Sequence, residues 1–201
     1  IMATYIFQKI AKEGNAAGVT PGTEDARDWF RDRAQQVRSV NPNRELRNTS
    51  RLYNKMTQTD IGRMYMFNYD PKHKETLPYY DRFPLIFVLD KYPDGFLGMN
   101  MHYLPLMYRA RLMDKLYDIE RDDRLRESKK LRITYSFLNS AAKYKYFKPT
   151  VKRYLTNHLR SRLLYIPYED WDTALFLPTE RFRKGKKSKV WNESKRIIQN
   201  G

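Results

Sequence analysis

The residue types that most often carry catalysis are sparse in this chain. Cysteine is absent, which excludes disulfides, thiol nucleophiles and thiolate metal sites. None of the three histidines has a partner at metal-ligand spacing, so each is interpreted as a structural hydrogen-bonding residue: His73, His102 and His158. The sequence therefore predicts no catalytic residue, no metal and no cofactor.

Two patterns suggest chemistry at first, but each has a simpler explanation. Residues 185–188 read Gly-Lys-Lys-Ser, yet they lack the upstream glycine and the preceding strand of a phosphate-binding loop. A metal-dependent nuclease needs carboxylates that converge beside a lysine, and Asp70, Asp81 and Asp90 with Lys91 are the candidate set. These aspartates stand at predicted turns, where they are favoured because they bond the local backbone. We therefore expect a protein that is not an enzyme.

The positive charge gives a stronger indication because it is concentrated at one end of the chain. The net charge is +16 over 201 residues. Residues 1–60 contribute +3, residues 61–120 contribute 0, and residues 121–201 contribute +13. Each lysine or arginine that meets a phosphate releases condensed counterions, a gain that requires no particular base sequence. The charge distribution predicts sequence-independent binding of DNA.

Basic residues alternate with aromatic ones within this cationic end, at 144–148 and 181–184. In such runs the cations can hold phosphates while the rings either stack on bases or belong to the core, and the sequence leaves both open. The cluster at 186–189 favours phosphate contact, since like charges repel unless an anion relieves them. The residues predicted to bind DNA are Lys143, Lys145, Lys148, Lys152, Arg153, Arg160, Arg162, Arg181, Arg183, Lys184, Lys186, Lys187 and Lys189.

Hydrophobic periodicity indicates the helices that position these side chains. Helical spacing is found over residues 2–13, 23–37, 105–116, 136–145, 170–177 and 190–199. A further helix is predicted to begin at Pro149, on which a line of aliphatic residues four apart leaves most of the basic side chains off the apolar face: Val151, Leu155, Leu159 and Leu163. Residues 39–60 are polar and predict an extended linker.

The middle of the chain changes to period two, which is typical of strands. In residues 63–69 the rings of Tyr65, Phe67 and Tyr69 share one face, and Met64 and Met66 share the other. Residues 84–89 and 96–103 predict two more strands around a turn at 92–95, and closing a barrel needs a further strand, best supplied by 131–135.

The predicted class is α+β: a small bent antiparallel sheet or SH3-like barrel flanked by N- and C-terminal helices. Its segments are an N-terminal helical arm and linker (1–60), a small β-barrel-like core with one inserted helix (61–135), and a basic helical region (136–201). Hydrophobic residues make up 41% and aromatic residues 14%, enough to predict a folded protein. No apolar run approaches the ~20 residues of a membrane helix, and no secretory start is visible, so we expect a cytoplasmic origin and no membrane partner.

Residues 62–105, together with 174–180 and Val190-Trp191, resemble small basic proteins of T-even-like tailed phages, of the kind labelled DNA end protector. The resemblance covers roughly residues 25–198. It implies a virion structural protein that sits on the ends of packaged DNA and shields them from host exonuclease, located in the host cytoplasm during assembly. It supplies no catalytic motif. The alternative is a neck, tail or baseplate subunit, in which residues 61–120 dock other virion proteins of the head, neck or tail without specific DNA binding.

Overall fold

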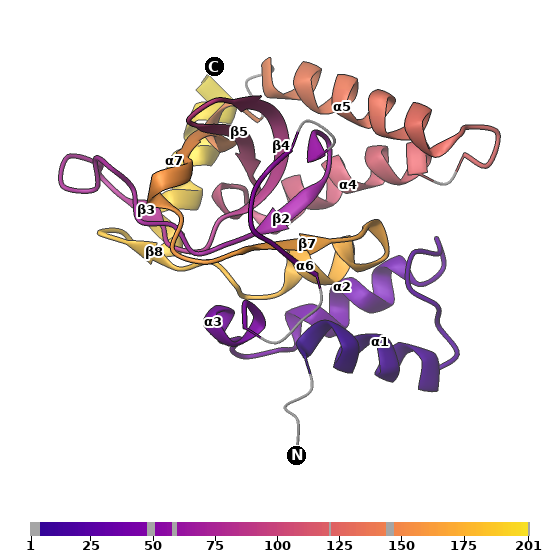
Figure 1. Ribbon diagram of the computed structural model, residues 1–201. Helices are drawn as coiled ribbons and strands as arrows, with labels where there is room; N and C mark the ends of the chain where they lie inside the picture. Colours follow the sequence, from indigo (N-terminus) through magenta and orange to yellow (C-terminus); the bar gives the residue numbers. More distant parts are fainter. Residues whose placement is uncertain (1–4, 48–50, 58–59, 121, 144–146, 201) are drawn as a thin grey trace.

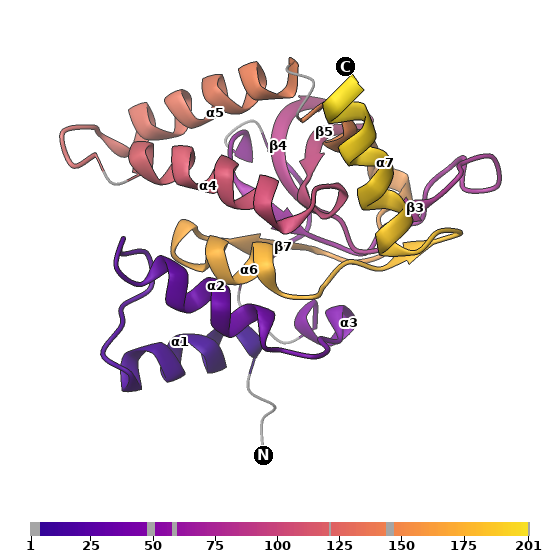
Figure 2. The same ribbon diagram turned by 180° about the vertical axis from the view of Figure 1, so that it is seen from behind.

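Helices surround a curled antiparallel sheet (Figure 1). The computed structural model describes residues 5–47, 51–57, 60–120, 122–143 and 147–200. Two groups of helices pack on the sheet, with α2 against α1 and α6, and α4 against α5 and α6. Turning the molecule by 180° shows α7 beside the end of β5, where it packs on the short helical turn that follows that strand (Figure 2). The helices are α1 (Ile6–Ala16), α2 (Arg27–Gln35), α3 (Pro42–Glu45), α4 (Leu106–Glu120), α5 (Glu127–Lys143), α6 (Trp171–Phe176) and α7 (Lys187–Asn200).

The sheet brings together strands from distant parts of the sequence. Its six strands are antiparallel, in the order β1-β7-β2-β4-β5-β6. They are β1 (Leu52–Tyr53), β2 (Met64–Met66), β4 (Leu85–Tyr92), β5 (Gly95–Asn100), β6 (Val151–Leu155) and β7 (Leu163–Ile166). A separate two-stranded ribbon pairs β3 (Tyr80–Asp81) with β8 (Phe182–Arg183). The division into three segments stays a prediction, and the large sheet takes strands from all three.

The predicted alternation around β2 is confirmed, because the two faces belong to different hydrophobic clusters. Met64 and Met66 lie in the main core beneath the helices. Tyr65, Phe67 and Tyr69 lie in a second, ring-rich cluster on the opposite face. The sheet is therefore buried on both faces, by helices on one side and by its own curled edge on the other.

The α+β class with a bent antiparallel sheet is confirmed, whereas the SH3-like barrel is wrong because the sheet is open. A bulge in β4 between Val88 and Asp90 strengthens the local twist. The curl carries the chain after β6 back to β2, where Tyr69 and Leu159 form an isolated antiparallel bridge. This single bridge does not pair the two edge strands of the sheet, so the sheet stays open. The strand expected at 131–135 to close the barrel is part of α5, where Thr134 lies buried one helical turn before the buried Leu138.

Two other expectations are wrong. The helix predicted after Pro149 is replaced by β6 and β7, because residues 151–155 pair along β5 with Tyr154 buried. The linker expected over 39–60 contains α3, which begins at Pro42, and β1. The helices predicted near 2–13, 23–37, 105–116, 170–177 and 190–199 are present as α1, α2, α4, α6 and α7. Among the described residues, no helix is both long and apolar enough to cross a membrane.

Gly95 fixes the distance between β5 and β6. A Cβ atom at this position would lie 1.9 Å from the carbonyl oxygen of Tyr154, so a side chain must push β6 away. We expect Gly95→Ala to lower the free energy of unfolding by about 1–3 kcal/mol, the usual cost of overpacking. Urea unfolding followed by circular dichroism measures it, and an unchanged midpoint would mean that the two strands are not this close.

Candidate nucleic-acid interface

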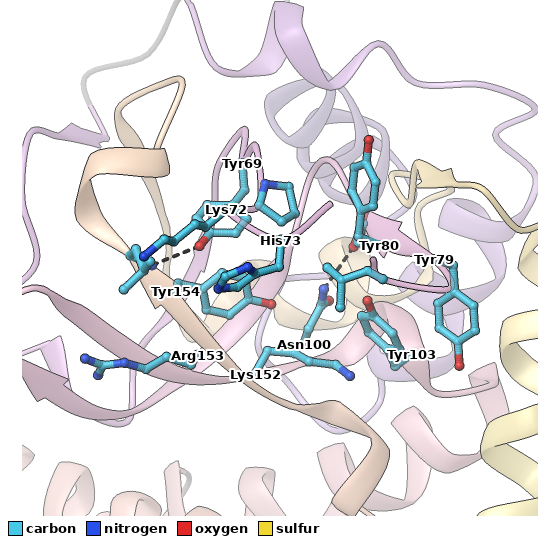
Figure 3. Close-up of a pocket in the computed structure, with 14 residues that line it drawn as sticks. Tyr69, Lys72, His73, Tyr79, Tyr80, Asn100, Tyr103, Lys152, Arg153 and Tyr154 are labelled. Carbon is cyan, nitrogen blue, oxygen red and sulfur yellow. Dashed lines mark hydrogen bonds between the residues drawn. The ribbon is translucent and has the colours of Figure 1, made fainter. Parts of the chain in front are cut away.

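A hollow of about 350 Å³ lies between β6, the turn after β5 and the loop that precedes β3 (Figure 3). Its walls are mainly aromatic, and we call it the tyrosine pocket. The five tyrosines that line it are Tyr69, Tyr79, Tyr80, Tyr103 and Tyr154.

Each tyrosine is held by the element that carries it. Tyr69 and Tyr154 belong to the ring-rich face of the curled sheet, with ring centroids 5.0 Å apart, and the Tyr69 hydroxyl accepts a hydrogen bond from the Leu155 amide at 2.9 Å. Tyr103 ends the helical turn after β5. Tyr80 lies in β3, which is kept in place by pairing with Arg183 of β8. The pocket is thus built on the sheet and closed by the small ribbon.

Two basic residues of β6 face different surroundings at this pocket. The ammonium of Lys152 lies 4.3 Å from the centroid of the Tyr103 ring. Burial lowers the pKa of Lys152, and the Glu193 carboxylate of α7 opposes that shift. The guanidinium carbon of Arg153 lies 3.8 Å from the centroid of the Tyr92 ring, and the guanidinium forms an ion pair with Asp94. These two contacts hold the Arg153 side chain away from the five tyrosines of the pocket.

The loop over residues 70–76 gathers further basic side chains. Asp70 forms ion pairs with Lys74 at 3.1 Å, Arg82 at 3.0 Å and Arg160 at 3.8 Å. Lys184, whose φ is 64°, donates from Nζ to the carbonyl oxygens of residues 74 and 75 at 3.1 and 2.9 Å. Figure 1 shows this loop and the loop after β8 projecting side by side. Cations from the neutral middle and from the basic end therefore meet here.

A second hollow of about 510 Å³, which we call the basic cleft, lies beyond β8. Phe182 of β8 lines the cleft and also packs against two rings of the tyrosine pocket, 6.5 Å from Tyr79 and 5.2 Å from Tyr103. The two hollows are neighbours. The basic residues that line the cleft are Arg38, Arg181, Lys186 and Lys187.

Several of the predicted DNA-binding residues also have internal partners. Arg181 donates to the carbonyl oxygens of Pro178 and Glu180 at 3.0 and 2.8 Å, and Lys187 pairs with the Glu180 carboxylate at 3.0 Å. These contacts shape the cleft. Among the described residues, no carboxylate forms an ion pair with Lys186 or Lys189, and both are exposed.

The structure places the predicted residues in three groups. Four surround the tyrosine pocket or its loop: Lys152, Arg153, Arg160 and Lys184. Three line the basic cleft: Arg181, Lys186 and Lys187. Four are exposed elsewhere or beside these hollows: Lys148, Arg162, Arg183 and Lys189. The side chains of Lys143 and Lys145 lie outside the described residues. Binding of DNA by all of them stays a prediction.

Sequence reasoning missed the part of the site that comes from the middle of the chain. Lys72, His73, Tyr79 and Tyr80 all line the tyrosine pocket, yet their block has no net charge. The sequence contains one indication, since the basic run 72–74 lies between Tyr69 and the pair Tyr79-Tyr80.

The nuclease arrangement considered from the sequence is not assembled. Among the described residues, no three histidine, aspartate or glutamate side chains are grouped so as to hold a metal ion. The turn positions expected of these aspartates are wrong for two of them, because Asp81 lies in β3 and Asp90 lies within β4. Both still bond the local backbone: Asp81 accepts from the Phe83 amide at 3.1 Å, and Asp90 accepts from the Lys91 amide at 2.8 Å.

A buried relay has the residue types of a hydrolase triad, with its aspartate at the wall of the tyrosine pocket and its histidine fully buried. His102 lies 2.6 Å from Asp81 Oδ2 through Nδ1 and 2.9 Å from Thr179 Oγ1 through Nε2. Their exposed fractions are 0%, 3% and 2% for His102, Asp81 and Thr179. Burial alone would raise the pKa of Asp81, but His102 and the hydrogen bonds to the carboxylate lower it overall. The relay is a structural link between β3, the turn after β5 and the segment before β8.

Comparison with curated proteins found no match, and comparison with solved structures found none either. The sequence does match the family described as phage T4 terminal DNA protecting protein, over residues 7–199. This span contains every residue that lines the tyrosine pocket and the basic cleft. Since the match covers nearly the whole chain, the protein belongs to the phage T4 terminal DNA protecting protein family.

Proposed function

We propose that this protein is a non-enzymatic virion component that grips the DNA backbone without sequence preference and covers the ends of packaged DNA. Family membership is the observation that carries the proposal. The net charge of +13 on residues 121–201 supports the backbone mode, because phosphate contacts are independent of base sequence.

The geometry supports a contact surface centred on the tyrosine pocket and the basic cleft. Both hollows lie beside β8, and basic residues from three parts of the chain line them. The exposed cations that lack an ion pair among the described residues, such as Lys186 and Lys189, are the ones free to contact phosphate. Basic residues with internal partners, such as Arg181 and Lys187, hold the surface from which Lys186 and Lys189 project.

A salt series on two DNA forms tests the proposal. We compare a blunt linear duplex with a covalently closed circle of the same sequence, between about 50 and about 200 mM salt. The logarithm of the binding constant should fall linearly with the logarithm of the salt concentration, and the linear form should bind more tightly. A flat salt response would exclude phosphate binding, and equal affinity for both forms would exclude end recognition.

The double variant Lys186→Ala/Lys189→Ala tests the location. We expect it to weaken binding to all sequences alike and to reduce the salt slope by about 2, roughly 1 for each lost phosphate contact. The matched control is Arg126→Ala/Lys129→Ala, which removes the same charge from exposed positions at the start of α5, at the other end of the molecule (Figure 1). Equal losses in the two variants would mean that total charge, and not this surface, binds DNA.

Two further assays complete the test. Protein bound to a linear duplex should slow its digestion by an exonuclease, and supercoiled DNA should stay intact when the protein is added with Mg²⁺ or Mn²⁺. We place the protein in the virion and, during assembly, in the host cytoplasm, where other virion proteins are its partners. A pull-down from disrupted particles identifies them, and assembly that is insensitive to salt and needs no DNA would favour a neck, tail or baseplate subunit instead.

A further inference from the structure

We propose that the tyrosine pocket takes one unpaired nucleotide from the DNA terminus, with its base among the tyrosine rings and its phosphate at Lys152. The inference rests on the proposed function and adds to it a defined ligand site. Backbone binding alone does not tell an end from an internal stretch of DNA, so the protein needs a feature that responds to the end itself.

The size and lining of the pocket fit a nucleobase. Its volume of about 350 Å³ lies within the range of about 300–1,000 Å³ that is common for small-molecule sites. The half-buried ring of Tyr79 lies 6.1 Å from the buried ring of Tyr103, measured between ring centroids, and the buried ring of Tyr154 lines the same hollow. Aromatic rings bind bases of any identity, because every base has a flat π face.

The charges in and around the pocket fit a phosphate. Figure 3 shows Lys152 directed toward Tyr103 inside the pocket, while Arg153 extends away from the tyrosines. Among the described residues, no carboxylate forms an ion pair with Lys152, and Lys72 and His73 supply further donors from the opposite wall. The acidic lining residue, Asp81, is buried against His102. A phosphate group would restore to Lys152 the favourable surroundings that burial removes.

The same pocket accounts for the proposed preference for a terminus over an internal base pair. A base inside a closed duplex must unpair and unstack before it can enter a pocket, which costs a few kcal/mol, whereas a frayed or overhanging nucleotide is already free. The pocket thus converts the difference between an end and an interior into a difference in affinity. It does so without reading the base.

The experiment uses the full chain and a hairpin duplex whose single open end carries one unpaired 2-aminopurine nucleotide. Stacking among the tyrosines should quench the 2-aminopurine fluorescence when the protein binds. Both Tyr79→Ala and Lys152→Gln should lose the quenching and bind the open end roughly 5- to 100-fold more weakly. Binding to a dumbbell duplex closed at both ends should stay within about twofold of the wild-type value.

Two other variants keep the test decisive even if Tyr79→Ala is unstable. Tyr53→Ala removes a tyrosine that is 49% exposed on β1 and lines no part of the pocket, so it should retain the quenching. Glu193→Gln removes the carboxylate that acts on Lys152, so it should tighten binding to the open end several-fold and leave dumbbell binding unchanged.

The pocket and the proposed function fail in distinguishable ways. Wild-type protein that prefers the open end and blocks exonuclease, but neither quenches 2-aminopurine nor responds to Lys152→Gln, would overturn the pocket and leave the function intact. Wild-type protein without end preference would overturn the proposed function. Weaker binding by Glu193→Gln would contradict the phosphate position at Lys152.

Discussion

Replacing Arg109 with methionine is expected to lower the free energy of unfolding by about 3–5 kcal/mol. The Arg109 side chain is fully buried, and its guanidinium donates to three carbonyl oxygens: Leu104 at 2.7 Å, Leu175 at 2.6 Å and His102 at 3.3 Å. Methionine fills much of the volume but donates nothing. The buried carbonyl oxygens of Leu104 and Leu175 would then lose this donor, and each unsatisfied group costs about 1–3 kcal/mol. The His102 carbonyl oxygen keeps a second donor, Nε1 of Trp191.

Arg109 lies in α4 and joins this helix to several other elements. It connects the turn after β5 with α6, and its guanidinium lies 5.4 Å from the ring of Trp191 in α7. Trp191 in turn donates from Nε1 to the His102 carbonyl oxygen at 2.8 Å. Burial lowers the pKa of Arg109 to about 10, with Glu180 and Asp81 opposing the shift, so the group stays charged at neutral pH.

Urea unfolding followed by tryptophan fluorescence measures the change. Arg111→Met is the matched control, since Arg111 lies on the same helix with its side chain exposed and should change stability by less than about 0.5 kcal/mol. If both variants unfold at the same midpoint, the buried guanidinium does not hold these elements together.

Local patterns in the sequence were sufficient to predict the parts of the fold that depend on near neighbours. The alternation of Met64 and Met66 with Tyr65 and Phe67 reports which face of β2 meets the helices, because a strand turns successive side chains to opposite sides. The helix after Pro105 follows from the same kind of spacing.

Elements that depend on distant partners could not be predicted in this way. Val151 and Leu155 stand four apart, as on a helix face, but pairing with β5 more than fifty residues earlier makes the segment a strand. The tyrosine pocket has the same origin. Tyr69, Tyr103 and Tyr154 each look like core residues in the sequence, and it is the curl of the sheet that brings them to one hollow. Long-range pairing leaves little trace in a local pattern.

Raising the pH above about 10 is expected to unfold the protein steeply. Burial raises the pKa of seven tyrosines, and for Tyr79, with help from Glu193, the value is about 12. They are Tyr5, Tyr65, Tyr69, Tyr79, Tyr103, Tyr117 and Tyr154. In the unfolded chain the same side chains ionise near a pKa of about 10. Above this pH the unfolded state releases protons that the folded state retains.

This difference in pKa makes the free energy of unfolding fall as the pH rises. A pKa raised by folding contributes stability that is complete below the unfolded value and is lost as the pH rises toward the folded value. Each such tyrosine removes up to about 1.4 kcal/mol per pH unit once it is ionised in the unfolded chain. Arg109 and Lys152, whose pKa values burial lowers, act in the opposite direction. Because seven tyrosines lower the free energy of unfolding as the pH rises and only two basic groups raise it, the net effect is a loss of stability.

Thermal unfolding between about pH 8 and about pH 11, with tyrosinate absorbance recorded in parallel, measures this loss. The folded protein should show a delayed tyrosinate signal that appears together with unfolding. Tyr154→Phe removes one buried hydroxyl and keeps the ring that packs 5.3 Å from Phe67, so the pH dependence of its stability should be shallower by about 1.4 kcal/mol per pH unit. If all tyrosines titrate near their ordinary pKa while the fold persists, the ring-rich face of the sheet is open to water, and the pocket built on it lacks the dry walls that stacking requires.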